Sequence, residues 1–281
     1  MTGGRLRAGV MGWPVGHSLS PVMMTAWLQA AGIAGSYEKL AVEPSGFEAA
    51  CARLKADGFS GVNITIPHKE AALRVADTAS DAARAIGAAN VLRVTATGLH
   101  ADNTDIAGIR AALDEAGWQG DGPVALVGAG GAARAALYVL DVLASRGIGD
   151  IRILNRTPER AQKIAQEMGV TARIFTMDDA SHALEGATLL VNATSLGMAG
   201  QPALMPAISQ LEGGAIVFDM VYVPLETPLL AEARKAGLKT ADGLSMLIGQ
   251  ARPAFEAFFG APPPVDVDVR ALMEAALEPK R

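Results

Sequence analysis

The stretch from Val124 to Ala136 constrains the fold more than any other part of the chain. The apolar run VALV is followed at once by the turn GAGG and then by an alanine-rich segment. This order is typical of the strand, turn and helix that bind the pyrophosphate of a dinucleotide. Gly128 allows the tight turn, Gly130 lets the backbone approach the phosphates, and Ala133 lets the helix pack close to the strand. An ordinary strand-to-helix turn can have the same residues, so the flanking pattern has to support the interpretation.

The residues after the next predicted strand, Ile151 to Leu154, indicate which dinucleotide binds. This strand ends about 20 residues or slightly more beyond the glycines, where an NAD site usually has an acid for the ribose 2′-hydroxyl. The chain has no acid there, and instead has Asn155, Arg156, Thr157 and Arg160. Because a guanidinium offers a planar fork to phosphate oxygens, we expect NADP rather than NAD. The alternative is a solvated Arg156 and a Thr157 that merely caps the next helix.

Length and composition narrow the class of protein. The chain has 281 residues, enough for two domains, and half of them are apolar while 19% are charged, as in a well-packed globule. A formal net charge of −5, with Lys and Arg dispersed, argues against a nucleic-acid surface. The single Cys51 excludes an intramolecular disulfide, and no Cys or His residues at ligand spacing predict a metal site. Since no apolar segment of about 18 residues is present, we expect no membrane span and a cytoplasmic location.

Polar residues follow the first predicted strand, Leu6 to Met11. Ser18 and Ser20 come just before a helix that Pro21 is expected to open. Hydroxyls beside the free N–H groups of a helix start can receive a carboxylate, although such residues also act as ordinary caps.

A second polar group follows the predicted strand from Gly61 to Ile66. Asn63 and Thr65 alternate with apolar residues, and Lys69 follows at the start of a helix. These side chains could point into one crevice, whereas a solvated lysine is the simpler alternative for Lys69. A short helix is expected from Thr78 to Ile86. Asp105 opens a later helix, where an aspartate is also what capping requires.

From Val124 onward, predicted strands and helices alternate regularly as far as a strand from Ile216 to Asp219 and a last strand from Leu238 to Ala241. Such alternation predicts a parallel, doubly wound sheet. A loop of small residues that contains Thr194 would lie at its carboxyl edge, where cofactors bind. A long helix follows from about Gly243 and contains Gln250.

Several motifs carry a resemblance to a known family, and they run in order through the sequence: HSLSP at 17–21, NITIPHKE at 63–70, NTD at 103–105, GAGGAA at 128–133, NRT at 155–157, NATS at 192–195, DMVY at 219–222, and DGLSMLIGQ at 242–250. In order and spacing they resemble those of shikimate dehydrogenases, from Gly9 to about Leu277. The resemblance implies two α/β domains, a substrate-binding domain and a Rossmann-type NADP domain with a doubly wound parallel sheet. It places the substrate domain at 1–103, completed by returning C-terminal helices at 243–281, and the NADP domain at 104–242.

The resemblance also implies roles for particular residues. Lys69 and Asp105 would form the catalytic acid–base pair. The expected substrate-binding residues are Ser18 and Ser20 for the carboxylate, and Asn63, Thr65, Asn90, Gln250 and the nearby Tyr222 for the ring. The expected cofactor-binding residues are Gly128, Ala129, Gly130, Gly131, Ala132, Asn155, Arg156, Thr157, Arg160, Thr194, Met220 and Gly243.

The implied reaction is the reversible reduction of 3-dehydroshikimate to shikimate by NADPH, a step toward chorismate and the aromatic amino acids. The implied partners are the small-molecule substrate and NADP, with neither nucleic acid nor membrane; a homodimer is left open. His68, Val91, Met24 with Thr25, and Ser245 depart from residues common in the family and leave the substrate range open. For His68 we favour a substitution on a half-buried face over a catalytic role. The alternatives are a quinate/shikimate or aminoshikimate-type dehydrogenase and, more remotely, a non-catalytic NADP-binding sensor.

Overall fold

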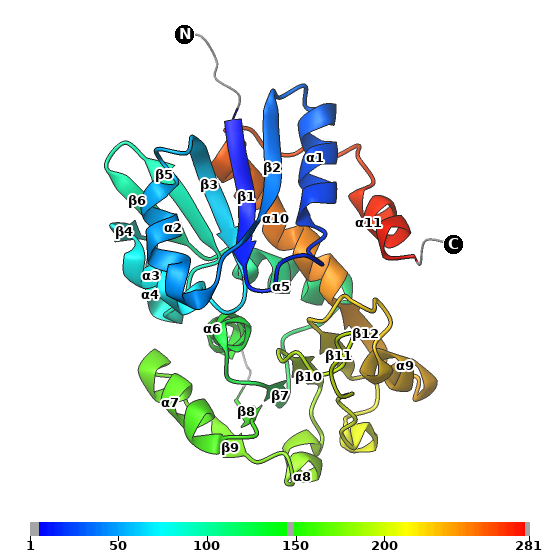
Figure 1. The fold of residues 1–281 in the computed structure, drawn as a ribbon. Coiled ribbons are helices and arrows are strands. Elements are labelled where there is room, and N and C mark those ends of the chain that lie inside the picture. Colours follow the sequence, from blue (N-terminus) through cyan, green and yellow to red (C-terminus); the bar gives the residue numbers. More distant parts are fainter. Residues whose placement is uncertain (1–5, 145–148, 279–281) are drawn as a thin grey trace. The chain divides into compact units, whose positions relative to one another are not determined.

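The computed structural model describes residues 6–144 and 149–278 and divides into two compact units (Figure 1). Unit 1 comprises Met1–Asp105 and Gln250–Arg281, and unit 2 comprises Ile106–Gly249. The two boundaries lie at the start of helix α5 (Asp105–Glu115) and inside helix α10 (Gly243–Phe259). The roles predicted for the two domains, substrate binding and NADP binding, stay predictions at this point.

Unit 1 contains a mixed six-stranded sheet in the order β2-β1-β3-β5-β6-β4. Its strands are β1 (Leu6–Gly12), β2 (Gly35–Ala41), β3 (Phe59–Ile64), β4 (Thr78–Ala79), β5 (Val91–Thr95) and β6 (Gly98–Asp102). β1 pairs in parallel with β2 and β3, whereas β5 runs antiparallel to β3 and β6. The parallel pairing brings the carboxyl ends of β1 and β3 to the same edge of the sheet, and the loops that follow both strands begin there.

The helices of unit 1 come from both ends of the sequence. They are α1 (Ser20–Ala30), η1 (Pro44–Gly46), α2 (Phe47–Arg53), α3 (Lys69–Val75), α4 (Asp81–Ile86), the part of α10 from Gln250 onward, and α11 (Val269–Leu277). Phe255 of α10 packs edge-on against Trp27 of α1, with ring centroids 5.6 Å apart, and α11 packs against α1. The C-terminal helices therefore return to the N-terminal sheet, as expected from the family resemblance.

Unit 2 contains a fully parallel six-stranded sheet in the order β12-β11-β10-β7-β8-β9. Its strands are β7 (Val124–Val127), β8 (Ile151–Leu154), β9 (Arg173–Phe175), β10 (Leu189–Asn192), β11 (Ile216–Asp219) and β12 (Lys239–Asp242). Every residue of β7, β8, β10 and β11 is buried, as in a parallel sheet covered on both faces. The strand order is that of a doubly wound dinucleotide-binding sheet, with its switch point between β7 and β10.

The helices of unit 2 include α5, α6 (Gly131–Ala144), α7 (Pro158–Met168), α8 (Ala180–Leu184), η2 (Ile208–Gln210), α9 (Pro228–Lys235) and the first turns of α10. Local signals explain where α7 and α9 begin and where α7 ends. Both have Pro at their first position, Thr227 caps α9 by accepting the N–H of Leu230, and Gly169 ends α7 in the left-handed conformation at φ 68°.

The predicted elements agree with the structure along most of the chain, with one clear error. The sequence predicted a helix over Thr78 to Ile86, but Thr78–Ala79 form β4 and the helix begins at Asp81. Ser80 is extended, its N–H donates to Ala101 O and its hydroxyl caps α4 by accepting the N–H of Ala83. The cap fixes the helix start, and pairing with β6 holds the preceding residues extended.

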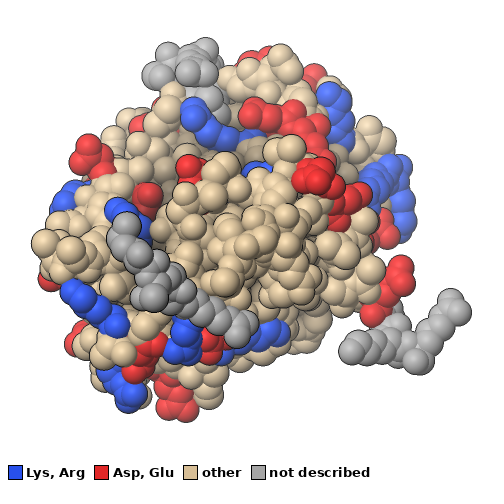
Figure 2. Space-filling model, turned by 90° about the horizontal axis from the view of Figure 1, so that it is seen from above, with Lys and Arg blue, Asp and Glu red and all other residues tan. Residues whose placement is uncertain are grey.

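On the face that Figure 2 shows, both basic and acidic side chains of the described residues are scattered among uncharged ones. No helix in the described part of the chain is long and apolar enough to cross a membrane. Within the same residues, no cluster of three or more His, Cys, Asp or Glu side chains could hold a metal ion.

Gly61 of β3 offers a test of this packing. A Cβ at Gly61 would lie 2.6 Å from the Phe258 ring and 2.7 Å from Leu92 O, so Gly61→Ala is expected to overpack unit 1. Such overpacking typically costs about 1–3 kcal/mol, which lowers Tm by several degrees. The matched control is Gly46→Ala, whose Cβ would have its nearest neighbour at 3.9 Å. Equal Tm values for the two variants, measured by circular dichroism, would contradict this account of the core.

Candidate active site

Loops at one edge of the unit 1 sheet bring together the two residues predicted to be catalytic. β3 ends at Ile64, a turn closed by the bond from His68 N to Thr65 O follows, and α3 then begins at Lys69. Asp105 is the first residue of α5, directly after the segment that leaves β6. The two side chains are thus separated by 36 positions in the sequence, and the fold places them in contact.

Lys69 and Asp105 form a largely buried ion pair. Lys69 Nζ lies 2.5 Å from Asp105 Oδ2, and the two side chains are only 14% and 5% exposed. The other carboxylate oxygen, Asp105 Oδ1, accepts a hydrogen bond of 2.8 Å from Asn90 Nδ2. Lys69 is therefore not a solvated surface lysine, and Asp105 uses both oxygens for tertiary contacts. Because buried charges are stable only when paired and hydrogen-bonded, each of these contacts holds the others in place.

Asn90 joins this pair to two further polar residues. Its Oδ1 accepts the N–H of Thr104 at 2.7 Å, and its Nδ2 lies 3.3 Å from Gln250 Oε1. The Thr104 hydroxyl also lies 3.3 Å from Gln250 Oε1. Gln250 is 8% exposed, although an isolated glutamine is usually a surface residue. We call Lys69, Asp105, Asn90, Thr104 and Gln250 the Lys69 cluster.

Asn63 and Thr65 stand next to this cluster along β3 and the turn that follows it. Asn63 is buried, its Oδ1 accepts the Tyr37 hydroxyl at 2.7 Å, and its Nδ2 donates to Asn90 O at 3.3 Å. Thr65 is partly exposed, and its N–H donates to Met11 O at 2.9 Å. Because the Asn90 carbonyl only accepts, its bond fixes Nδ2 as the donor end of the Asn63 amide and Oδ1 as the acceptor of the Tyr37 hydroxyl.

Ser18 and Ser20 lie in the loop after β1 and at the start of α1. Both are largely buried, and the N–H of Ser20 lies 3.4 Å from Ser18 Oγ. The N-cap position of α1 is occupied by Leu19, so no side chain caps the helix there. The first N–H groups of α1 are already used, since Ser20 N faces Ser18 Oγ, Pro21 has none and Val22 N donates to Leu19 O, so the two hydroxyls are the donors that this helix start can offer an anion.

His68 precedes Lys69 and is fully buried rather than half-buried. Its ring stacks on Phe47 with centroids 4.4 Å apart, and Nε2 lies 2.7 Å from Val42 O. Because a carbonyl only accepts, Nε2 carries the proton in this contact. These contacts support a packing role at the start of α3, as the sequence analysis favoured over a catalytic one.

The glycine turn of unit 2 has the geometry expected of a phosphate-binding loop. Gly128 adopts φ 120°, and a Cβ there would lie 3.0 Å from Thr194 and 3.2 Å from Ala193 O, so only glycine fits. A Cβ at Gly130 would meet nothing within 4 Å, which leaves open space beside the start of α6. Ala129, Gly131 and Ala132 complete the turn and the first residues of the helix. The first N–H groups of a helix have no intrahelical acceptor, so they can bind an anion.

Arg156, Thr157 and Arg160 are exposed after the carboxyl end of β8. Within the described chain, neither guanidinium has a hydrogen bond or an ion pair, so both are free to bind a ligand. Thr157 occupies the N-cap position of α7, but its hydroxyl makes no cap hydrogen bond. Asn155 Nδ2 donates to Thr157 O at 2.7 Å and shapes the turn. Capping by Thr157, the alternative interpretation, is not what the structure shows.

The other predicted cofactor residues of unit 2 lie after β10, β11 and β12. The Thr194 hydroxyl and N–H both donate to Asn192 Oδ1, at 2.7 and 3.0 Å. Met220 N donates to Asn192 O at 3.0 Å, and a Cβ at Gly243 would lie 2.3 Å from Met220 O. Tyr222, predicted to lie near the substrate, is half-buried in the loop after β11.

Thr104, Tyr37 and Asn103 contribute to the site geometry, although sequence reasoning gave them no role. Asn103 Oδ1 accepts the N–H of Asp105 at 3.1 Å, and its Nδ2 donates to Ala88 O at 2.9 Å. The NTD motif at 103–105 was the available signal for Asn103 and Thr104. Tyr37 had no signal, because a tyrosine in a strand usually indicates packing alone.

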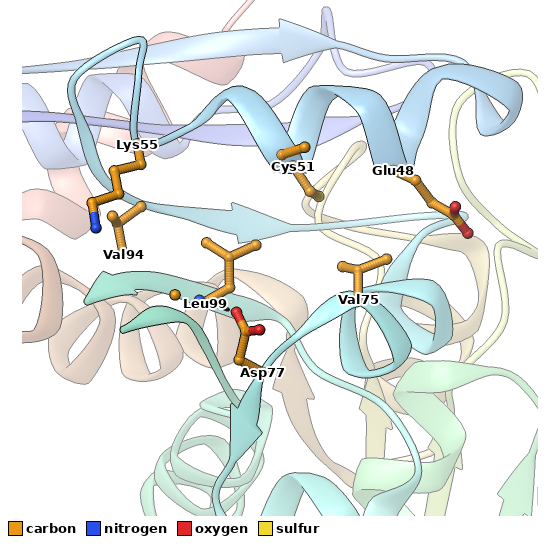
Figure 3. A pocket seen from close by; sticks show the side chains of 9 residues that line it. Glu48, Cys51, Lys55, Val75, Asp77, Val94 and Leu99 are labelled. Atoms are coloured by element: carbon orange, nitrogen blue, oxygen red, sulfur yellow. Dashed lines mark hydrogen bonds between the residues drawn. The ribbon is translucent and has the colours of Figure 1, made fainter. Parts of the chain in front are cut away.

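A cavity of about 310 Å³ in unit 1 is separate from these residues (Figure 3). It is lined by Glu48, Cys51, Ala52, Lys55, Val75, Asp77, Val94, Gly98 and Leu99, and by none of the predicted site residues. Burial, with a smaller contribution from the Glu48 carboxylate, raises the pKa of the Cys51 thiol to about 12. The thiol is therefore protonated at neutral pH and is not a nucleophile, so this cavity lacks the chemistry of the Lys69 cluster.

Comparison with known proteins covers most of the chain. The family model described as shikimate dehydrogenase substrate binding domain matches residues 10–92, that described as shikimate / quinate 5-dehydrogenase matches 112–207, and that described as shikimate 5′-dehydrogenase C-terminal domain matches 243–273. Shikimate dehydrogenase (NADP(+)) from Rhodopseudomonas palustris strain HaA2 is 48% identical over 279 residues, covering 99% of this chain and 98% of its own length.

Two solved structures extend the comparison to the fold. Shikimate 5-dehydrogenase from Thermus thermophilus, in complex with NADP(H) and shikimate, has a TM-score of 0.83 and 36% identity, with 97% of this chain and 98% of that chain covered. Quinate dehydrogenase from Corynebacterium glutamicum, in complex with NAD, has a TM-score of 0.83 and 31% identity, with 97% and 99% covered. Identity and coverage together place the chain in one family: it belongs to the shikimate dehydrogenases.

Proposed function

We propose that this chain catalyses the reversible, NADP-dependent reduction of 3-dehydroshikimate to shikimate, with Lys69 as the proton donor and Asp105 as the residue that orients it. The observation that carries the proposal is the buried Lys69–Asp105 pair at 2.5 Å, held by Asn90 in a chain of the shikimate dehydrogenase family. A cytoplasmic location is part of the proposal, since the reaction is a step of small-molecule biosynthesis.

The chemistry requires a proton donor at the ketone oxygen, because hydride addition to the carbonyl carbon develops negative charge there. NADPH, when bound, supplies the hydride. The Lys69 ammonium has three N–H donors, of which one is directed to Asp105 Oδ2, leaving donors for the substrate oxygen. In the forward direction the proton passes from Nζ to that oxygen, and in the reverse direction Lys69 accepts it from the alcohol.

Asp105 acts on Lys69 and the substrate as an ionised acceptor. Its Oδ2 faces an ammonium and its Oδ1 faces an amide N–H, so both oxygens receive donors and neither needs a proton of its own. This favours Lys69, rather than Asp105, as the group that transfers the proton. The negative charge of Asp105 holds the ammonium in one position, which lowers the reorganisation needed during the reaction.

The remaining polar residues of unit 1 are assigned to substrate binding. Ser18 and Ser20, at the start of α1, would hold the carboxylate. Asn63, Thr65, Asn90 and Gln250 would bind ring hydroxyls, and Tyr222 of unit 2 would contribute from the loop after β11. The residues of the glycine turn and of the loops after β8, β10 and β11 would hold NADP, since the φ of Gly128 and the free guanidinium groups fit a pyrophosphate and a 2′-phosphate.

A quinate/shikimate dehydrogenase is the second candidate, because a quinate dehydrogenase is among the structures with similar fold and 31% identity. The two functions share the Lys69 chemistry and differ in recognition of the ring and of the cofactor. Initial rates with shikimate and quinate, each with NADP and with NAD, distinguish them. A non-catalytic NADP-binding sensor would bind the cofactor and turn over neither acid.

Lys69→Ala tests the catalytic assignment. Because general acid–base catalysis contributes about 10²–10⁴-fold, kcat for shikimate oxidation with NADP is expected to fall at least about 10²-fold, while the Kd for NADP is unchanged. The matched control is Lys55→Ala, an exposed lysine whose ammonium donates to Ala96 O at 2.9 Å and lines the separate cavity. A Lys69→Ala enzyme with parental kcat would refute the role of Lys69.

Arg156→Ala tests the choice of cofactor. A charge-assisted hydrogen bond is worth about 1.5–3 kcal/mol, so loss of the 2′-phosphate contact is expected to raise KM for NADP about 10- to 100-fold and to leave KM for NAD unchanged. The control is Lys163→Ala, which removes an exposed positive charge within α7 and should change neither KM for NADP nor KM for NAD. Equal increases for NADP and NAD, or the same increase in the Lys163 variant, would argue against a specific 2′-phosphate contact.

A further inference from the structure

Asp219, the last residue of β11, is a fully buried carboxylate to which the proposed reaction gives no role. Its Oδ1 accepts hydrogen bonds from Asn192 Nδ2 at 2.8 Å and from Val221 N at 3.0 Å. Its Oδ2 accepts the Thr227 hydroxyl at 2.7 Å. Burial raises the pKa of Asp219, and the three hydrogen bonds partly oppose that effect. A polar group with no exposure and three donors directed at it is expected to fix the segments that supply the donors.

The first of these segments is the loop after β10. Asn192 uses one amide N–H for Asp219 and also donates to Leu196 O at 3.0 Å. Its Oδ1 accepts both the N–H and the hydroxyl of Thr194, whose Oγ1 in turn accepts the N–H of Leu196 at 3.1 Å. The bonds to Asp219 and to Leu196 O together set which end of the Asn192 amide faces Thr194, and so help to set the direction of the Thr194 hydroxyl.

The second segment is the loop after β11. Val221 N donates to Asp219 Oδ1, and the preceding Met220 N donates to Asn192 O at 3.0 Å. Asp219 and Asn192 thus hold the two loops together at the carboxyl ends of adjacent parallel strands. In a doubly wound sheet, cofactors lie at this edge.

The third segment belongs to a different part of unit 2. Thr227 is fully buried and caps α9 by accepting the N–H of Leu230 at 3.3 Å, and its hydroxyl donates to the other oxygen of Asp219. The two oxygens of one carboxylate therefore serve two separate purposes. Oδ1 holds the two loops, whereas Oδ2 holds the start of a helix.

We infer that Asp219 is a positioning residue that orients Thr194 and Met220 for NADP through its Oδ1 bonds to Asn192 and Val221. The inference rests on the proposed function, because Thr194 and Met220 are cofactor contacts only if NADP binds at this edge of the unit 2 sheet. Asp219 acts through the two loops and touches neither substrate nor cofactor.

Three variants separate positioning from general stability. Asp219→Ala removes the acceptor of both Asn192 and Val221, so Thr194 and Met220 lose their fixed positions and the Kd and KM for NADP are expected to rise about tenfold or more. kcat at saturating NADP and KM for shikimate should stay within about threefold of the parent values. Asp219→Asn keeps one oxygen that can accept from Asn192 and Val221, so its KM for NADP should stay within about threefold as well.

Thr227→Val is the control for stability. It removes the bond to Oδ2 and the cap of α9, so Tm should fall while the Kd for NADP, measured by quenching of intrinsic fluorescence, stays unchanged. If Asp219→Ala does not fold, Asn192→Ala removes the next link to Thr194 and should raise the Kd for NADP in the same way.

Two results would overturn the inference: parental NADP affinity in Asp219→Ala, or an equal loss of affinity in Thr227→Val. A parent protein that neither binds NADP nor oxidises shikimate would refute the proposed function itself, whatever the variants do.

Discussion

The ion pair between Lys69 and Asp105 is the contact on which the rest of the Lys69 cluster depends. Two opposite charges with little exposure are stable only if each finds further partners, and the surrounding residues supply them. Asn90 donates to Asp105, Thr104 fixes Asn90, and Asn103 accepts the backbone N–H of Asp105. These contacts explain why the Asp105 carboxylate, at the start of α5, makes tertiary hydrogen bonds and does not cap its own helix.

The proposed NADP site in unit 2 depends on the close approach of backbone segments rather than on charge. Gly128 and Gly243 have no room for a Cβ, and the parallel sheet of unit 2 brings the loops after β7, β10 and β11 to one edge. The exposed guanidinium groups of Arg156 and Arg160 add positive charge after the neighbouring strand β8. Buried hydrogen bonds around Asp219 then fix loops that would otherwise have several conformations.

Much of the fold could be predicted from the sequence because its signals are local. The VALV strand, the glycine turn and the proline at the start of α7 are contained in short segments, and the bounds predicted for β7, β8 and β11 agree with the structure. The bond between Asn90 and Gln250 joins residues 160 positions apart, and periodicity does not show such a contact. The family resemblance named these two residues as site residues, but it did not reveal their bond to each other. Thr78 was assigned to a helix because the extended pairing with β6 depends on residues about 20 positions later in the chain.

The most direct test of the central claim is a double-mutant cycle on Lys69 and Asp105. The measurement is kcat/KM for shikimate at saturating NADP in Lys69→Ala, Asp105→Asn, the double variant and the parent. If the pair acts as one unit, the double variant should be about as impaired as the worse single variant, because the second change removes a partner that has already lost its function. Independent, multiplicative losses would contradict the account.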